Sequence, residues 1–234
     1  MENIFWKPNN EIIEMLVNMC QNYKYTKILE NGPGMTPFPL STHFIDIQPQ
    51  LEKNNNTITI DIDFDKIPFE DGYFDFCYAR HIFEDLQNPQ HAFSESIRVC
   101  KNGYIETPSP LIECLKMVDS LSRKNNINYC GYIHHRYIVW TDIDTNTLYF
   151  LPKYPFLEYL EFDPDFAKYM LDMAKEKIYW NNYYLWMEET TQSPKIFVYR
   201  NGVNFHIVDD YKNLVMMAIN KSIKSTQFHF SSKI

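Results

Sequence analysis

Glycine, basic side chains and long apolar runs are all scarce in this chain of 234 residues. Only 6 glycines accompany 17 tyrosines and 17 phenylalanines, which excludes glycine-rich fibrous proteins and flexible linkers. Lys and Arg number 22 against 30 Asp and Glu, a formal net charge of −8. This balance argues against a general nucleic-acid binder, which usually carries a basic patch. No apolar run reaches the roughly 18 residues of a transmembrane helix, and Met1–Pro8 lacks a basic flank, so we expect neither a membrane span nor a secretory signal.

Cysteine is also sparse, and its pattern excludes two kinds of cross-link. The cysteines are odd in number and widely spaced, with no CxxC pair: Cys20, Cys77, Cys100, Cys114 and Cys130. A disulfide framework and a zinc knuckle are therefore not expected, and the expected location is the cytoplasm, or the host cytoplasm if the chain is viral. Cys130, His134 and His135 lack a fourth partner and adjacent histidines seldom share an ion, so we expect no metal.

Apolar residues make up 45% of the chain, enough for the core of one domain with or without an insertion. Strand and helix patterns alternate as far as about residue 120, as in a parallel α/β sheet. The expected strands are 27–30, 42–47, 57–64, 74–79 and 104–107, and the expected helices begin at Asn10, Asn88-Pro89 and Ser109-Pro110. Further on we expect strands 136–140 and 147–151, a helix from Asp163-Pro164, a hairpin at 196–208 around Asn201-Gly202, a helix over 210–224 and a tail at 225–234.

The residues best suited to chemistry follow the first two strands. The first strand ends at Glu30 and runs into Gly32-Pro33-Gly34, and the second ends at Asp46. Glycines let backbone N–H groups approach a ligand, and a carboxylate such as Asp46 accepts hydrogen bonds from ribose hydroxyls. A P-loop is excluded because no Gly-Lys-Ser/Thr follows, and Pro37 and Pro39 stand where a phosphate-binding helix would begin. A ligand that has a ribose but no phosphate fits this pattern better.

Five ordered motifs carry a family resemblance. They are Gly32–Pro39 (GPGMTPFP), Ile67–Asp75 (IPFEDGYFD), His81–Asp85 (HIFED), Gly103–Pro110 (GYIETPSP) and His135–Tyr137. The chain resembles the class I S-adenosylmethionine (SAM)-dependent methyltransferases over about residues 25 to 140, specifically a type 11-like subgroup with GPGxxPxP and GYIExPSP motifs. The resemblance implies a Rossmann-like α/β fold, with a seven-stranded, mostly parallel sheet flanked by helices and closed by the 196–208 hairpin. It implies SAM as cofactor and S-adenosylhomocysteine (SAH) as product.

The resemblance also implies roles for individual residues. The cofactor-binding set is Glu30, Asn31, Gly32, Pro33, Gly34, Asp46, Ile47, Asp63, Phe64, Ala79, Arg80 and His81. Within it, Asp46 would bind the ribose, and Asp63 and Phe64 the adenine. Two positions depart from the family pattern: Asp85 replaces a second histidine, and Arg80 is an unusual cation that would bind an acidic acceptor or pair with a nearby carboxylate.

Histidine suits the general base that a hydroxyl acceptor requires near neutral pH. His81, at the carboxyl end of a strand, is the first candidate, and His135 and Glu106 are the second. Arg80, His134, His135 and Arg136 are the expected substrate-binding residues. Two alternatives stay open: His81 could only brace the cofactor loop, and His135-Arg136 could be a structural pair.

We expect a single methyltransferase domain over 1–234. Residues 1–108 and 195–208 would form its SAM-binding core, and 109–194 an aromatic-rich α+β insertion that covers the acceptor. The expected acceptor is a small molecule, such as a sugar or nucleotide-sugar hydroxyl or amine, and neither a nucleic acid nor a membrane is an expected partner. A homodimer through the 210–224 helix is one option. The alternatives are a catalytically degenerate binding protein and a nucleotide-sugar oxidoreductase.

Overall fold

The computed structural model describes residues 8–48, 56–190, 192–199 and 208–230. The chain divides into two compact units, which are described separately. The sheet unit comprises Lys7–Glu106 and Tyr184–Pro194, and the hairpin unit comprises Thr107–Tyr183 and Lys195–Ile234 together with Met1–Trp6. Within the described ranges, no helix is long and apolar enough to cross a membrane.

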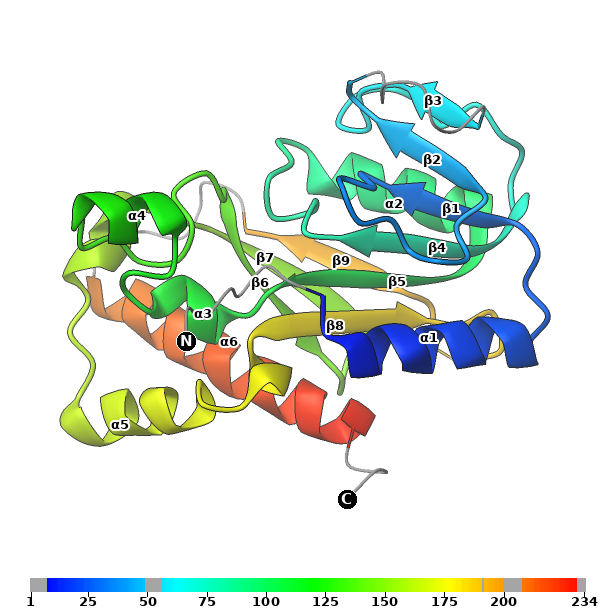
Figure 1. Cartoon of the computed structure of the whole chain (residues 1–234). Coiled ribbons are helices and arrows are strands. Elements are labelled where there is room, and N and C mark those ends of the chain that lie inside the picture. Colours follow the sequence, from blue (N-terminus) through cyan, green and yellow to red (C-terminus); the bar gives the residue numbers. More distant parts are fainter. Residues whose placement is uncertain (1–7, 49–55, 191, 200–207, 231–234) are drawn as a thin grey trace. The chain divides into compact units, whose positions relative to one another are not determined.

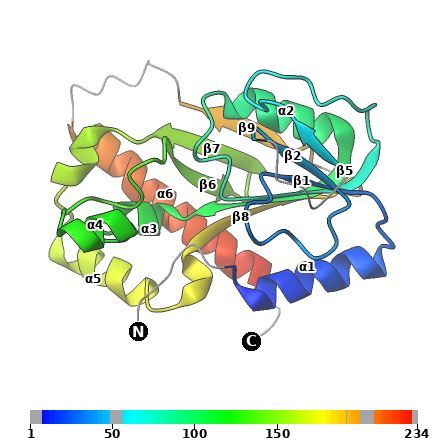
Figure 2. The same ribbon diagram turned by 45° about the horizontal axis from the view of Figure 1, so that its top comes forward.

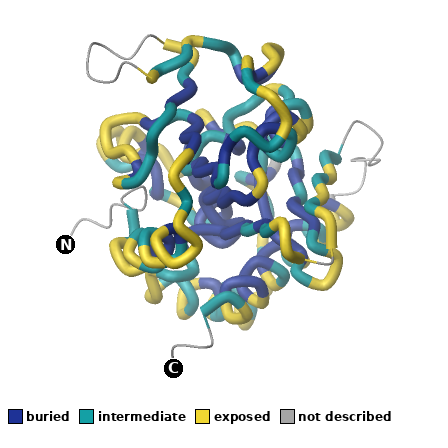
Figure 3. The backbone as a smooth tube through the Cα atoms, turned by 90° about the vertical axis from the view of Figure 1, so that its right-hand side faces the viewer, coloured by how far each residue is buried: buried dark blue, intermediate teal, exposed yellow. Residues whose placement is uncertain are grey.

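A sheet with the strand order β3-β2-β1-β4-β5-β8 organises the sheet unit. Its strands are β1 (Ile28–Asn31), β2 (His43–Asp46), β3 (Thr57–Thr59), β4 (Phe74–Arg80), β5 (Cys100–Pro108) and β8 (Asn181–Trp186). The pairs β3–β2, β2–β1, β1–β4 and β4–β5 are all parallel. Strands β1 and β4 are largely buried, because parallel strands are covered on both faces. Figure 3 colours buried stretches of the backbone dark blue. The prediction of a Rossmann-like, mostly parallel α/β sheet is confirmed.

Helices α1 (Asn10–Asn22) and α2 (Pro89–Val99) lie on opposite faces of this sheet (Figures 1 and 2). Helix α2 begins as predicted, since the side chain of Asn88 accepts a hydrogen bond from the His91 N–H and Pro89 occupies the first turn. Helix α1 is capped by Asn9, one residue before the expected Asn10. Two adjacent asparagines are equally good caps, so only the folded backbone selects between them.

The sheet's far edge differs from the sequence expectation. Among the described residues the sheet has six strands rather than seven, and its edge strand β8 comes from a segment expected to lie in the insertion. Residues Lys195–Val198 form strand β9, which pairs in parallel with β7 of a second sheet and so does not close the first one. The turn at 201–202 lies outside the described residues. Gly103 lies inside β5, where a Cβ would come within 2.2 Å of the Trp186 ring.

The hairpin unit is built on two antiparallel strands, as predicted, β6 (Tyr137–Asp142) and β7 (Thr147–Pro152). Its helices are α3 (Pro110–Cys114), α4 (Ser120–Asn125), α5 (Pro164–Met173) and α6 (Val208–Phe230), with short 3-10 helices at Pro155–Tyr159 and Lys177–Tyr179. Tyr211, Val215 and Ile219 of α6 join Ile138 and Trp140 in one buried apolar core. Helix α6 continues to Phe230, so most of the expected tail is helical.

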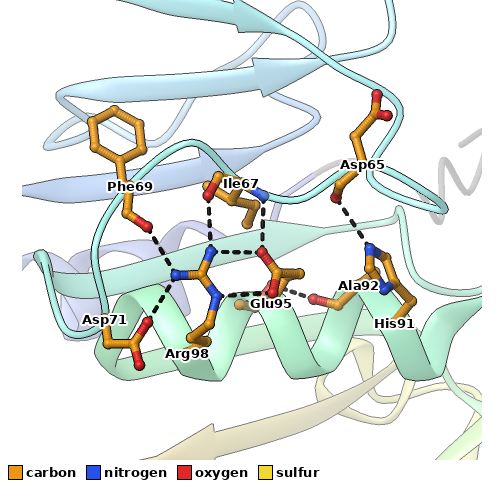
Figure 4. A network of polar contacts seen from close by, with 9 residues as sticks. Asp65, Ile67, Phe69, Asp71, His91, Ala92, Glu95 and Arg98 are labelled. Atoms are coloured by element: carbon orange, nitrogen blue, oxygen red, sulfur yellow. Dashed lines mark hydrogen bonds and ion pairs between the residues drawn. The ribbon is translucent and has the colours of Figure 1, made fainter.

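A polar network on α2 holds the Ile67–Asp71 loop in place (Figure 4). The Arg98 guanidinium donates hydrogen bonds to the carbonyl oxygens of Ile67 and Phe69, both at 2.8 Å, and to the Asp71 carboxylate at 2.9 Å. It also pairs with Glu95 at 2.6 Å, and Glu95 accepts the Ile67 N–H at 2.8 Å. The hydrogen bond from Arg98 is the main reason that the pKa of Glu95 is lowered. Two side chains thus satisfy most of the loop's buried backbone polar groups.

Replacing Arg98 by Met should therefore destabilise the sheet unit. The variant leaves Glu95 and two carbonyl groups without their donor, at a cost of about 2–4 kcal/mol. Urea unfolding of R98M and wild type measures the difference. K175M is the control, because the exposed Lys175–Asp172 pair, with side chains 72% and 47% accessible, should leave the midpoint unchanged. Equal midpoints for R98M and wild type would contradict the assigned role.

Candidate active site

The strand order places a topological switch point at one edge of the sheet unit, where a ligand-binding crevice is expected. Strand β1 lies between β2 and β4, so the chain leaves β1 toward β2 on one side and leaves β4 toward β5 on the other. In open α/β sheets, ligands bind outside the carboxyl ends of the strands at such a point of divergence. The residues at these ends are Asn31 on β1, Asp46 on β2 and Arg80 on β4. Three of the predicted cofactor-binding residues therefore lie at this edge.

The loop after β1 folds back over Glu30. Residues 32–42, all of which the structure describes, contain no helix, which agrees with the placement of Pro37 and Pro39. The buried carboxylate of Glu30 accepts the Phe38 N–H through both oxygens, at 3.1 and 3.0 Å. The Phe38 ring stacks on Tyr78 of β4 with ring centroids 4.6 Å apart. Glu30 thus shapes the loop from beneath, and phosphate would find no helix terminus there.

The two glycines of this loop have different structural roles. Both have left-handed backbones, with φ of +62° at Gly32 and +52° at Gly34. A Cβ at Gly32 would lie 2.1 Å from Cδ1 of Ile82, so this glycine permits close packing within the protein. A Cβ at Gly34 would meet no heavy atom within 4 Å, so this exposed glycine borders open space. Of the two, Gly34 is the one placed to let a ligand approach the backbone.

Several predicted cofactor residues are engaged in the scaffold. Nδ2 of the buried Asn31 donates to Ser96 Oγ at 3.1 Å. Asp63 accepts the backbone N–H groups of Gln87 and Asn88 at 3.0 and 2.8 Å, and so fastens its loop to the start of α2. Pro33 and Ala79 are buried in the same unit. These side chains shape the crevice from behind.

A carboxylate, Asp46, and two exposed apolar side chains, Ile47 and Phe64, form what we call the rim of this edge. Asp46 is half-buried, and its Oδ1 accepts the Gln48 N–H at 2.9 Å. Ile47 and Phe64 are 65% and 62% exposed, an unusual state for large apolar side chains. The Phe64 N–H donates to the Asp61 carbonyl at 3.0 Å within a tight turn. The rim therefore offers a polar group next to apolar surfaces.

Charged groups gather where β4 and β5 end. The backbone of His81 is left-handed, with φ of +56°, and its N–H donates to the Glu106 carbonyl at 2.8 Å. The ring lies between two buried carboxylates, with Nδ1 3.5 Å from Glu84 and Nε2 3.8 Å from Glu106. Tyr104 donates to the other oxygen of Glu106 at 2.5 Å. Of the predicted residues, His81 and Glu106 are thus brought together, whereas the part played by Tyr104 was missed because a strand pattern carries no sign of it.

Burial governs the protonation of the acidic groups at this edge. It raises the pKa of Glu30 to about 7, against the opposing effects of hydrogen bonds from Ser41 and Phe38 and of the Arg80 charge. It also raises the pKa of Glu106, against the hydrogen bond from Tyr104 and the Arg80 charge. Nη2 of Arg80 lies 3.5 Å from Thr36 Oγ1 of the β1–β2 loop. The edge therefore holds one carboxyl group, that of Glu30, that can change charge near neutral pH.

The remaining predicted residues belong to the hairpin unit. His134 and Arg136 are exposed, whereas His135 is buried and its Nδ1 lies 2.7 Å from Glu113. Glu113 pairs in turn with Lys153 at 2.7 Å. Nothing in the sequence pattern pointed to Glu113 or Lys153, since their partners are distant along the chain. The aromatic residues Trp180 and Tyr183 are buried, so they pack in the interior of the fold.

The raised pKa of Glu30 predicts a pH-dependent stability that E30Q should abolish. The folded state holds the Glu30 proton up to about pH 7 and the exposed side chain only to 4.5, so stability falls as pH rises between these values. The shift corresponds to about 3 kcal/mol, which the uncharged Gln side chain does not lose. Urea unfolding at pH 5 and pH 8 measures this, and E14Q at an exposed position of α1 is the control. A wild-type pH dependence in E30Q would contradict the assignment.

Known proteins are similar to the part of the chain that contains this edge of the sheet. Residues 23–105 match the family model described as a methyltransferase domain, about a third of the chain. Among curated proteins no sequence is significantly similar. One similar solved structure is a SAM-dependent methyltransferase from Aquifex aeolicus, at 18% identity over 44% of this chain and 75% of that chain, with a TM-score of 0.30.

Two further solved structures are similar over part of their length. One is a SAM-dependent methyltransferase from Mesorhizobium loti, at 13% identity over 38% of this chain and 49% of that one, with a TM-score of 0.30. The other is a plantazolicin methyltransferase in complex with SAH, at 17% identity over 42% and 46%, with a TM-score of 0.34. The match thus spans about half the length of these two proteins. Residues 23–105 of this chain are similar to a methyltransferase domain.

Proposed function

We propose that this chain is a SAM-dependent methyltransferase that transfers a methyl group to a small-molecule acceptor. One observation carries the proposal. The matched segment 23–105 contains β1 to β4 and most of β5, and so includes Asn31, Asp46 and Arg80 at the point where the two connections diverge. This overlap supports a cofactor site at that point.

The residues at the crevice fit the parts of SAM. Asp46 would accept the ribose hydroxyls, and Ile47 and Phe64 would cover the faces of the adenine, which accounts for their exposure. Gly34 borders open space where the methionine part would pass, and Glu30 shapes that loop from below. Asp63 would act on the adenine mainly by holding Phe64 in its turn, because its own oxygens accept the N–H groups of Gln87 and Asn88 just before α2.

SAM supplies an electrophilic methyl group on a sulfonium, and the protein's task is to align the acceptor and exclude water. Arg80, His81 and Glu106 stand at the ends of β4 and β5, next to the crevice. His81 has a carboxylate near each ring nitrogen, with Nδ1 3.5 Å from Glu84 and Nε2 3.8 Å from Glu106, and these groups can orient its ring. His81 is the first candidate for the proton acceptor. Glu106 and His135 are the second candidates.

For the acceptor we propose a sugar or nucleotide-sugar hydroxyl or amine. An acidic chain suits such a molecule better than a nucleic acid, and Arg80 offers a cation for an anionic part of the acceptor. Residues 109–194, with His134 and Arg136 exposed, would cover the acceptor. The alternative is a binding protein of the same fold that has lost catalysis, and its support is Asp85 at the position where the family has a second histidine.

Calorimetric titration with SAM and with SAH tests the cofactor proposal. Both ligands should bind, and D46N should weaken both by about tenfold or more, because a charged hydrogen-bond acceptor for the ribose is lost. D144N is the matched control, since Asp144 lies in the β6–β7 turn and pairs with Lys221 and Lys224. No heat with either ligand from a folded sample would refute the proposal.

A His81→Asn variant separates an enzyme from a binding protein. SAM affinity should stay within about threefold of wild type while methyl transfer to the first acceptor found among sugar nucleotides and amino sugars falls by about a hundredfold or more. SAM calorimetry and a radiolabelled methyl-transfer assay measure the two quantities. If the wild type binds SAM but methylates no member of a broad acceptor panel, the catalytically inactive alternative gains support.

A further inference from the structure

A buried carboxyl group lies beneath the β1–β2 loop, where the methionine part of SAM would pass. Glu30 is only 3% exposed. Both of its oxygens accept the Phe38 N–H, at 3.1 and 3.0 Å, and the Ser41 hydroxyl is a second donor. An ionised carboxylate has about four lone-pair sites, more than these two donors occupy. The hydrogen bonds therefore fix the loop over Glu30 but leave much of its negative charge uncompensated.

Two ionisable groups from β4 face Glu30, those of Tyr78 and Arg80. Burial raises the pKa of Tyr78, so its phenol stays neutral at neutral pH, whereas the charge of Arg80 favours the ionised form of Glu30. Loop residues 32–42 include no titratable side chain, and the residue opposite Glu30 on β2 is Phe44. Among these described neighbours, Arg80 is thus the cation that acts on Glu30 before a ligand binds.

A positive charge that enters at this loop would change the state of Glu30. Burial, the largest influence, raises the pKa of Glu30 to about 7, so both forms coexist at neutral pH. SAM and SAH differ by one charge, because the sulfonium of SAM becomes a thioether in SAH. In a buried environment the attraction between a carboxylate and a cation is much stronger than in water. The sulfonium would therefore favour the ionised form of Glu30, whereas the thioether would not.

We propose that Glu30 makes this site prefer the methyl donor over its product: SAM binding drives the Glu30 carboxyl group to its ionised form, and SAH binding does not. This inference rests on the proposed function. The carboxyl group gives its proton to the solvent when SAM binds, and takes one up again once methyl transfer has removed the sulfonium charge. Glu30 acts through space from beneath the loop, so it is a specificity residue and not a catalytic residue.

The first experiment is calorimetric titration of the full-length protein with SAM and with SAH at pH 5.5 and pH 7.5. If SAM lowers the titration midpoint of Glu30 by one pH unit, the ratio of the SAH to the SAM dissociation constant rises about sixfold between these pH values. In E30Q the rise should be absent, because Gln carries no titratable proton.

Two comparisons isolate Glu30 in this titration. The amino groups of the ligands titrate alike with wild type and with E30Q, so their contribution cancels between the two proteins. E14Q removes a carboxyl group at an exposed position of α1 and should keep the wild-type pH dependence. A rise in E30Q as large as that in wild type would overturn the role of Glu30.

The second experiment reads the Glu30 carboxyl group directly in the wild-type protein. Its side-chain carboxyl carbon, assigned by NMR through its bonds to the backbone, reports the titration of this one group. The midpoint should lie near pH 7 in the free protein, fall by about one pH unit or more with SAM, and stay unchanged with SAH. Equal midpoints with SAM and with SAH would overturn the proposal, and this measurement decides it even if E30Q does not fold.

The outcomes also separate this inference from the proposed function. If neither SAM nor SAH binds to the folded protein, the proposed function fails and the inference fails with it. If both bind and the ratio of their dissociation constants does not change with pH, the inference alone is overturned and the cofactor site stands.

Discussion

The parallel pairing of β1 with β4 is the constraint on which the sheet unit depends. Its register places Glu30 opposite Tyr78 and Asn31 opposite Ala79, so the loop after β1 begins beside Arg80 and His81. Because the chain then turns toward β2 from one strand and toward β5 from the other, the two connections diverge at the ends of the central pair. The open edge, its exposed apolar rim and its buried carboxylates all follow from this arrangement.

Side chains that hydrogen-bond to the protein's own backbone hold this edge in its conformation. Asp63 ties one end of the 63–71 loop to the start of α2, and Arg98 with Glu95 ties the other end to the last turns of that helix. A loop whose backbone groups are satisfied by a rigid helix can present Phe64 to solvent without collapsing around it. Several residues that a motif marks as ligand contacts thus act by holding their neighbours.

Both units bury acidic side chains, but the neighbouring charges differ between the units, and so do the shifts of the pKa values. Glu30 and Glu106 lie among a few donors and one guanidinium, and burial dominates, so their pKa values rise. Glu113 lies between His135 and Lys153, whose charge and hydrogen bonds outweigh burial, and its pKa falls although it is equally buried. A cation that binds next to a carboxyl group of the first kind favours its ionised form, whereas a carboxyl group of the second kind is already ionised. Glu30 and Glu106, of the first kind, lie at the candidate binding edge, whereas Glu113, of the second kind, pairs with a histidine.

The sequence alone determined the features that local chemistry decides. The cap-plus-proline pairs at Asn88, Ser109 and Asp163 began helices where expected, and the glycine–proline loop after β1 contained no helix. Alternation of strands and helices was enough to indicate a parallel α/β sheet, because each pattern spans only a few residues. The partner of each distant segment was decided by tertiary structure: β9 joins β7, β8 forms the edge beside β5, and His135 meets a carboxylate 22 residues earlier in the chain. A strand's pattern shows that it will be buried but not against which neighbour, and the charge state of a buried side chain depends on those neighbours.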